Sequence, residues 1–187
     1  MKNKEQILVD CLLRKEEVAW KEFFEAYSGN LSYVCSRYII DAEDVNDVLQ
    51  NSFLQMFHSI SSFEYRGAGS LKAWITKIVV NESLKHIKKK LNFKEISDDF
   101  EIPAEEGDED PNFEEISQHT IMEIIRALPE GYRTVFNLYV FEKKSHKEIA
   151  KILGIAENSS ASQFHRAKAI LVKKIKEYKM SKTAQYE

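Results

Sequence analysis

The chain has 187 residues, of which 43% are hydrophobic and 30% charged, the balance of a folded rather than a disordered protein. No run reaches the ~18 apolar residues of a membrane-spanning helix, and the first residues lack the features of a secretory signal, so we expect a cytoplasmic protein without membrane insertion. Cys11 and Cys35 are isolated in apolar patterns, which indicates reduced core thiols rather than a metal site.

Charge is distributed unevenly along the chain. Residues 1–90 carry 13 Lys and Arg against 12 Asp and Glu, residues 91–120 carry 1 against 11, and residues 121–187 carry 13 against 7. A strongly acidic segment therefore separates two near-neutral or basic ones. Because the acid is concentrated in one place, the net charge of −3 does not exclude nucleic-acid binding by the other segments.

Apolar residues at helical spacing predict three helices before residue 60. The first covers residues 16–28, and Gly29 and Asn30 are expected to separate it from the second. The third begins at Asp41, a suitable N-cap, and has acids in its first turn, where the helix dipole favours them. The residues expected to face the core are Val18, Ala19, Trp20, Phe23, Phe24, Tyr27, Leu31, Val34, Cys35, Tyr38, Val45, Val48, Leu49, Ser52, Phe53, Met56, Phe57 and Ile60.

The opposite face of the third helix is polar and almost uncharged. It contains Asn46, Asp47, Gln50, Asn51 and Gln55. A helix that meets only water usually carries more Lys and Glu, so this face is a candidate surface for a protein partner. A solvated face has the same pattern, and both interpretations stay open.

A loop with two aromatic residues, an arginine and two glycines, residues 63–69, precedes a long helix predicted over residues 70–90. One stripe of this helix is apolar, and Lys72, Lys77 and Asn81 lie largely off it. A cationic flank entered through an aromatic loop suits a nucleic-acid strand, with phosphates along the helix and unstacked bases against the loop. An ordinary amphipathic helix with solvated lysines is the alternative.

Residues 91–115 contain eleven acids, Pro103, Gly107 and Pro111, without a sustained apolar period. This composition predicts a flexible acidic linker. The acids at 108–110 lack the spacing of a calcium loop. A metal-dependent nuclease built on them is the weakest of the functional alternatives.

The segment 116–187 is predicted to contain a helix-turn-helix. A helix near 116–128 ends before Pro129, and the next helix carries an apolar face. SHKE at 145–148 is a capping box that starts a short helix, which ends at Gly154. A longer basic helix over about 158–176 follows, with Asn158 supplying the turn geometry. Such a unit either packs only on itself or places its second helix in the DNA major groove, and the basic charge favours DNA.

Two motifs in the first domain carry a family resemblance. DVLQNSF at 47–53 and GSLKAWITKIVVN at 69–81 resemble the core- and promoter-binding domain of bacterial sigma factors of the extracytoplasmic-function type. The resemblance implies that Asp47, Gln50, Asn51 and Phe53 belong to a helix that binds the polymerase clamp. It also implies that Phe63, Tyr65, Arg66, Lys72, Lys77 and Asn81 contact the melted minus-ten strand, whereas Trp74 is expected in the core.

EIAKILGI followed by SQFHRAKAIL resembles the minus-thirty-five-binding domain of the same family. The family commonly has Ser-Glu-Gly-Thr before the recognition helix and cationic residues within it, where this chain has Ala161 and Gln163. Base readout is therefore expected to shift toward polar side chains, with Gln suited to adenine, and the basic residues are expected at phosphates. The candidate duplex contacts are Ser159, Ser160, Ser162, Gln163, His165, Arg166 and Lys168.

These observations predict an all-α chain of two helical domains, 1–90 and 116–187, joined by the linker 91–115. The resemblance implies a sigma factor whose partners are promoter DNA and the RNA polymerase core, through its beta-prime clamp and beta flap, and it adds an anti-sigma factor as a candidate partner. A stand-alone helix-turn-helix regulator is the alternative. No phosphate loop, paired-histidine motif or nucleophile elbow is present, so we expect neither catalytic residues, nor a metal, nor a cofactor.

Overall fold

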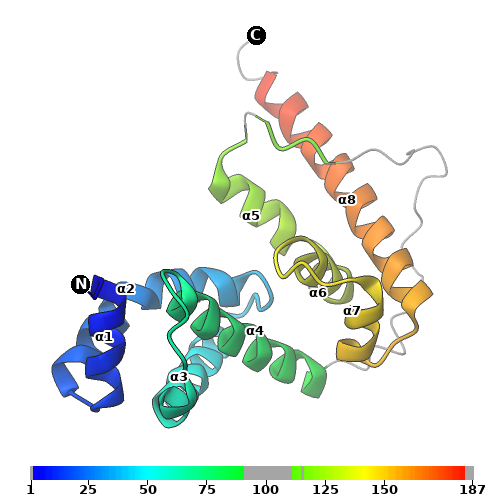
Figure 1. Cartoon of the computed structure of the whole chain (residues 1–187). Helices are drawn as coiled ribbons and strands as arrows, with labels where there is room; N and C mark the ends of the chain where they lie inside the picture. The colour runs from blue at the N-terminus through cyan, green and yellow to red at the C-terminus, as the bar shows by residue number, and fades with distance from the viewer. Residues whose placement is uncertain (1, 91–110, 115, 184–187) are drawn as a thin grey trace. The chain divides into compact units, whose positions relative to one another are not determined.

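A computed structural model describes residues 2–114, except 91–110, and residues 116–183. All regular structure within these ranges is helical, which confirms the all-α prediction (Figure 1). The contacts divide the chain into two compact units, residues 1–89 and 90–187. None of the described helices is long and apolar enough to cross a membrane. The predicted linker lies almost entirely outside the described residues.

The first unit contains four α-helices and one short 3-10 helix. They are α1 (Lys4–Leu13), α2 (Glu17–Ser36), α3 (Ala42–Ser59), η1 (Ile60–Ser62) and α4 (Ser70–Lys90). α2 packs against both α1 and α3. Asp41 is the N-cap of α3, as predicted, and its carboxylate accepts hydrogen bonds from the amides of Glu43 and Asp44.

One prediction for this unit was wrong, and one of its helices was not predicted. Gly29 and Asn30 do not separate two helices but lie inside the single twenty-residue helix α2. A glycine inside a helix costs about 1 kcal/mol relative to alanine, a cost that tertiary packing of the rest of α2 offsets. No helix was predicted at the position of α1, whose apolar residues are spread around the helix rather than gathered in one stripe; they are Ile7, Leu8, Val9, Cys11, Leu12 and Leu13.

α4 is buried over a wider face than one apolar stripe. Its buried residues are Leu71, Ile75, Ile78, Val79, Val80, Ser83, Leu84 and Ile87. At 3.6 residues per turn these positions cover most of the helix circumference. Ser83 is compatible with burial because its hydroxyl donates to the carbonyl of Val79 at 2.8 Å. The side of α4 that reaches solvent is therefore narrow.

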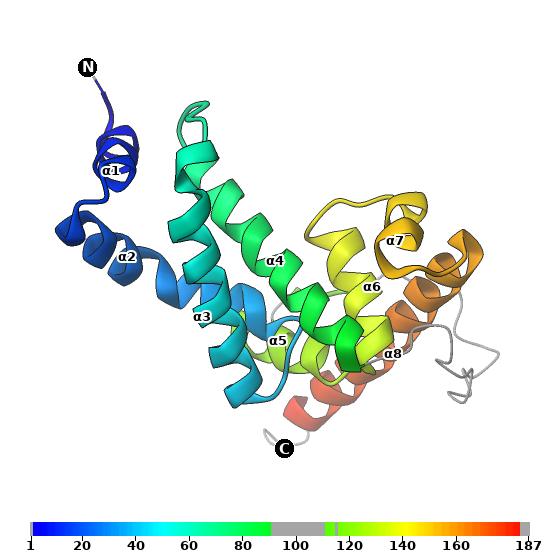
Figure 2. The same ribbon diagram turned by 90° about the horizontal axis from the view of Figure 1, so that it is seen from below.

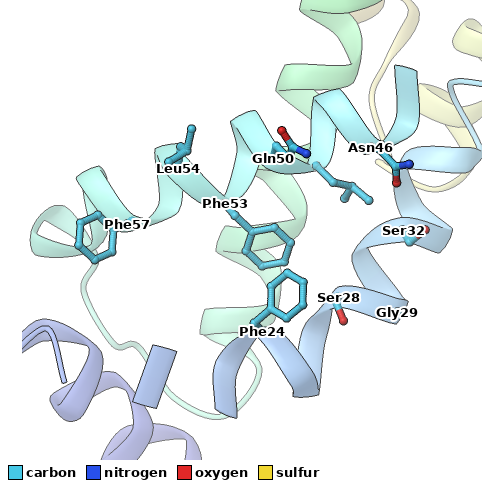
Figure 3. Close-up of a pocket in the computed structure, with 10 residues that line it drawn as sticks. Phe24, Ser28, Gly29, Ser32, Asn46, Gln50, Phe53, Leu54 and Phe57 are labelled. Carbon is cyan, nitrogen blue, oxygen red and sulfur yellow. The ribbon is translucent and has the colours of Figure 1, made fainter. Parts of the chain in front are cut away.

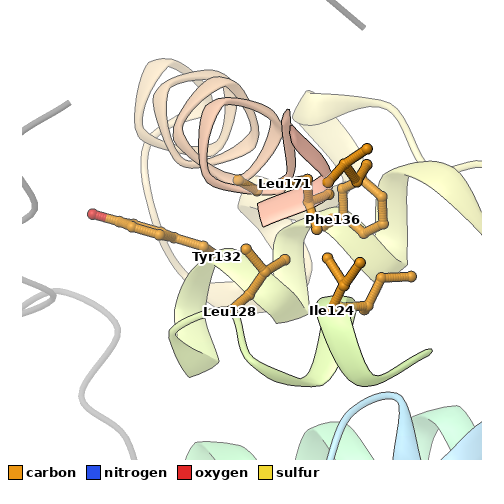
Figure 4. Packing of buried hydrophobic residues seen from close by; sticks show 8 residues of the cluster. Ile124, Leu128, Tyr132, Phe136 and Leu171 are labelled. Atoms are coloured by element: carbon orange, nitrogen blue, oxygen red, sulfur yellow. The ribbon is translucent and has the colours of Figure 1, made fainter. Parts of the chain in front are cut away.

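The second unit contains α5 (Gln118–Arg126), α6 (Glu130–Val140), α7 (His146–Leu153) and α8 (Glu157–Thr183). Its core lies where α5, α6 and α8 meet, and Figure 4 shows Ile124, Phe136 and Leu171 pointing toward one another. α8 packs along α6 and α7 (Figure 2). Asn158 lies in the first turn of α8, so the prediction that it makes the turn before the helix was wrong.

Arg133 of α6 ties this core to the end of α5. The side chain is buried, and its Nη1 atom donates to the carbonyl oxygens of Leu128 at 2.8 Å and Arg126 at 3.1 Å. Those carbonyls belong to the end of α5, where no further helical turn satisfies them. Burial lowers the pKa of the Arg133 guanidinium from its ordinary value.

Candidate nucleic-acid and protein interfaces

The solvent-facing side of α4 is a narrow cationic strip. Lys77, Asn81 and Lys85 are exposed and follow one another at intervals of four residues, so they lie along one flank. Lys72 is also exposed, but it precedes Lys77 by five residues and therefore lies well round the helix from this strip. Trp74, expected in the core, is only half-buried.

The loop before α4 has one buried and two solvent-reaching candidates. Phe63 is 9% exposed and packs on Trp74, with 5.1 Å between the ring centroids. The Tyr65 hydroxyl accepts a hydrogen bond from Nδ2 of Asn3 at 2.6 Å. Arg66 is exposed and pairs with Glu64 at 3.1 Å. Phe63 therefore packs the loop onto α4, contrary to the expectation that it contacts the melted DNA strand directly.

A groove between α2 and α3 occupies part of the predicted protein-binding face (Figure 3). Its volume is about 860 Å³, and both polar side chains, such as Gln50, and apolar ones line it. The complete lining is Phe24, Ser28, Gly29, Ser32, Asn46, Leu49, Gln50, Phe53, Leu54 and Phe57. Asp47 and Asn51 are exposed on α3 and do not line it.

Three apolar side chains of this groove are more exposed than the sequence indicates. The periodicity places Phe24 and Phe57 in the core and makes no prediction for Leu54. Phe24 is 52% exposed, Leu54 58% and Phe57 38%. The two aromatic side chains are held by ring contacts: Phe24 lies 4.9 Å from Phe53, and Phe57 lies 5.0 Å from Trp20, between ring centroids. The sequence signal for the groove was the excess of aromatic residues on α2, more than one face can bury.

The helix-turn-helix forms as predicted from its local signals. Ser145 Oγ accepts from the Glu148 amide, and a Glu148 carboxylate oxygen accepts from the Ser145 amide at 2.9 Å. The hydrogen bonds that the Glu148 carboxylate accepts, first from the Ser145 amide and then from the Lys144 side chain, lower the pKa of Glu148. Gly154 ends α7 with φ of +73°, the left-handed conformation that glycine adopts readily.

The start of α8 separates the candidate duplex contacts into two groups. Ser159, Ser162 and His165 are exposed, and Arg166 and Lys168 are half-buried. The other two are turned inward. Their expected contact with DNA is therefore corrected: Ser160 is fully buried and Gln163 is 7% exposed.

Ser160 is held inside by α7. Its hydroxyl lies 3.0 Å from Nδ1 of His146, which stacks on Tyr139 with 4.7 Å between ring centroids. Phe164 packs against the same tyrosine at 4.3 Å. This cluster packs the start of α8 against α6 and α7, and the sequence alone carries no signal for it.

Among the described residues no group of His, Cys, Asp and Glu is arranged to hold a metal ion. The acids at 108–110, on which the nuclease alternative depended, lie outside the described residues.

Two family models match the chain, one for each half. The model described as Sigma-70 region 2 matches residues 23–92, and the model described as Sigma-70, region 4 matches residues 118–171. The chain belongs to the sigma-70 family. The first match includes the α2–α3 groove and the α4 strip, and the second includes the helix-turn-helix.

Sequence comparisons with two sigma-E factors agree with this membership. The chain is 25% identical over 182 residues to the ECF RNA polymerase sigma-E factor of Haemophilus influenzae, covering 91% of this chain and 95% of that protein. The sigma-E factor of Escherichia coli (strain K12) is also 25% identical, with coverage of 91% and 94%. Among solved structures, "Structure of CnrH in complex with the cytosolic domain of CnrY" is similar, with a TM-score of 0.45, 19% identity and coverage of 88% and 92%.

This protein is therefore a sigma factor of the extracytoplasmic-function type, and it directs promoter-specific initiation by RNA polymerase. The alternative of a stand-alone regulator is not favoured, because a region 2 domain precedes the helix-turn-helix in the same chain.

Proposed function

We propose that this sigma factor docks on polymerase through the α2–α3 groove, captures the melted minus-ten strand along α4, and reads the minus-thirty-five duplex with the exposed face of α8. The observation that carries the proposal is the narrow cationic strip of α4, because most of this helix is buried and the strip is the longest exposed row of residues along it. The mechanism is binding, and strand opening is driven by trapping unstacked bases rather than by catalysis.

The groove suits a helical element of the polymerase clamp. Helix-in-groove recognition places apolar side chains of one partner into an apolar groove of the other. Leu54 and Phe57 supply exposed apolar surface, and Gln50 supplies a polar group at the edge that fixes orientation. Asp47 and Asn51, one turn apart on the same helix, extend the contact as a polar rim.

The α4 strip suits the non-template strand of the opened promoter. Lys77 attracts phosphates, and Asn81, one turn further on, offers donors and an acceptor to a base edge. Tyr65 and Arg66 present an aromatic ring and a planar cation in the loop, on which an extruded base can stack. Lys72 then serves as a phosphate contact outside the strip.

The duplex contacts are narrowed to one face of α8. Ser159, Ser162, His165 and Arg166 recur at intervals of three or four residues, so they form a continuous stripe at the start of the helix. The first residues of a recognition helix are those that reach base edges. Arg166 and Lys168 set register and salt dependence through phosphates.

The remaining partners follow from the sigma-factor assignment. We infer that the second unit contacts the polymerase beta flap, that an anti-sigma factor is a candidate regulator, and that the protein acts in the cytoplasm where polymerase and promoters meet. The acidic linker, residues 91–115, is proposed to thread near the RNA exit path, where an acidic chain suits a channel built for RNA.

Multi-round transcription with purified core polymerase on a library of genomic fragments tests the proposal as a whole. Specific start sites that require this protein are expected, and their upstream sequences give both promoter elements. Sequence-specific duplex binding by the protein alone, without any new transcript and without affinity for core polymerase, would contradict it.

Two pairs of variants separate the two surfaces of the first unit. Gln50→Ala and Asp47→Ala are expected to weaken core binding without lowering the melting temperature, because both side chains are exposed. Tyr65→Ala and Asn81→Ala are expected to impair open-complex formation while core binding and duplex binding persist. Unchanged core affinity in the first pair, or equal loss of every activity in the second, would contradict the assignments.

A further inference from the structure

α4 begins without a capping side chain of its own. Gly69, whose carbonyl accepts from the amide of Ala73 at 3.0 Å, stands at the N-cap position and has φ of +86°. A glycine there has no side-chain oxygen to accept from the first amides of the helix. Ser70 does not replace it, because the Ser70 hydroxyl accepts instead from the amide of Arg66 at 3.3 Å.

The missing cap is supplied by the N-terminal helix. Glu5 of α1 places one carboxylate oxygen 2.6 Å from the amide nitrogen of Gly69 and the other 2.8 Å from that of Leu71. Gly69 stands at the N-cap and Leu71 is the second helical residue, so both amides belong to the helix start, where no intrahelical acceptor is available. Here a single carboxylate from more than sixty residues earlier in the chain accepts from both, and its charge complements the helix dipole.

A second contact from the same helix holds the loop itself. Asn3 is the N-cap of α1, and its side-chain oxygen accepts from the amide of Gln6 at 2.8 Å. The nitrogen of the same side chain donates to the Tyr65 hydroxyl at 2.6 Å. The start of α1 is thus hydrogen-bonded to the loop at Tyr65 and at Gly69, on either side of Arg66.

We propose that Glu5 and Asn3 are positioning residues for strand capture: α1 fixes the conformation of loop 63–69 so that Tyr65 and Arg66 are preset to receive the extruded base. This inference rests on the proposed function of that loop.

The test uses holoenzyme assembled from core polymerase and the full-length chain, on the strongest promoter found in the transcription screen. Glu5→Ala is compared with Glu22→Ala, which removes an exposed acid from α2. Opening of the minus-ten segment is followed with 2-aminopurine in the non-template strand. We expect about tenfold less open complex for Glu5→Ala, the size of effect that loss of charge-assisted hydrogen bonds produces, and wild-type behaviour for Glu22→Ala.

A purely structural role is separated by three readouts. Core affinity and the melting temperature report on the fold of the first unit, whereas base preference at the captured position reports on the loop. A positioning role predicts reduced discrimination among the four bases with unchanged core affinity. If Glu5→Ala lowers core affinity by the same factor as open-complex formation and leaves base preference intact, the inference is wrong.

The Asn3–Tyr65 contact is tested by a double-mutant cycle. Asn3→Ser keeps a capping side chain for α1 but removes the donor to Tyr65, and Tyr65→Phe keeps the ring but removes the acceptor. Because both changes break one hydrogen bond, their effects on open-complex formation should not add. Additive effects would contradict a role for the Asn3–Tyr65 hydrogen bond in strand capture.

Failure of this inference is distinguishable from failure of the proposed function. If Tyr65→Ala impairs strand capture but Glu5→Ala and Asn3→Ser do not, only the positioning role of α1 is overturned. If Tyr65→Ala and Asn81→Ala also leave strand capture intact, the assignment of the loop and α4 to the minus-ten strand fails, and the inference fails with it.

Discussion

Replacing Leu54 with alanine probes the proposed docking groove most directly, because this side chain lines the groove and is mostly exposed in the isolated protein. Leu54 is 58% exposed, so the isolated protein gains little from it. Full burial of a leucine side chain is worth about 1.5–3 kcal/mol. Docking of polymerase would remove about half of that surface from water, so Leu54→Ala should cost about 1 kcal/mol of binding free energy, or about fivefold in Kd.

Competition for core polymerase against a fluorescently labelled wild-type chain measures this change. Met180→Ala is the matched control, since Met180 is 73% exposed but lies on α8, in the second unit. The melting temperature of Leu54→Ala should match that of the wild type. An unchanged Kd would refute docking in the groove, and a fall in melting temperature that accounts for the lost affinity would show that Leu54 supports the fold instead.

Three further changes test separate parts of the molecule. Gly29→Ala should stabilise α2 by about 0.5–1 kcal/mol, since a Cβ there meets nothing within 4 Å; an unchanged or lower melting temperature would indicate a break at this position. Arg166→Ala should weaken binding to all promoter sequences and reduce the salt slope by about one, whereas altered base preference would make Arg166 a base contact. Because the folded-state pKa of Glu148 is lowered, its stabilising effect should be present above the ordinary carboxyl pKa and lost as pH falls through the folded value. Melting temperatures of wild type and Glu148→Gln should therefore differ at neutral pH and converge in acid, and a constant difference would contradict the capping role.

Features that depend on neighbouring residues were predictable from the sequence. Asp41 and Ser145 start their helices because an N-cap oxygen needs only amides two or three residues away. Gly154 ends α7 because a left-handed residue is a local requirement. The family motifs add the order of the two domains, which no local signal supplies.

Features that depend on distant residues were not predictable in this way. Gly29 favours a helix break on local grounds. α2 nevertheless continues through it, because the packing of α2 against α1 and α3 offsets the cost of the glycine. Glu5 looks like an ordinary acid in a first helical turn, and only the fold brings its carboxylate to the amides of Gly69 and Leu71. Phe24 was assigned inward by periodicity, but α3 leaves it at the rim of a groove.

In the proposed recognition helix α8, contacts with distant residues bury two of the side chains that were expected to contact DNA. Ser160 and Gln163 share the inward face with Ala167 and Leu171, at spacings of three and four residues. Ser160 is tolerated there because His146 reaches it from α7, whereas the Oε1 atom of Gln163 is buried without a hydrogen-bond partner among the described residues. Burial of Gln163 removes the side chain best suited to adenine. If α8 reads the duplex as proposed, its specificity then rests on the two exposed serines and His165. Hydroxyl and imidazole groups make single rather than bidentate hydrogen bonds to bases. Such contacts discriminate weakly, and the orientation fixed by phosphate contacts then matters more for promoter choice.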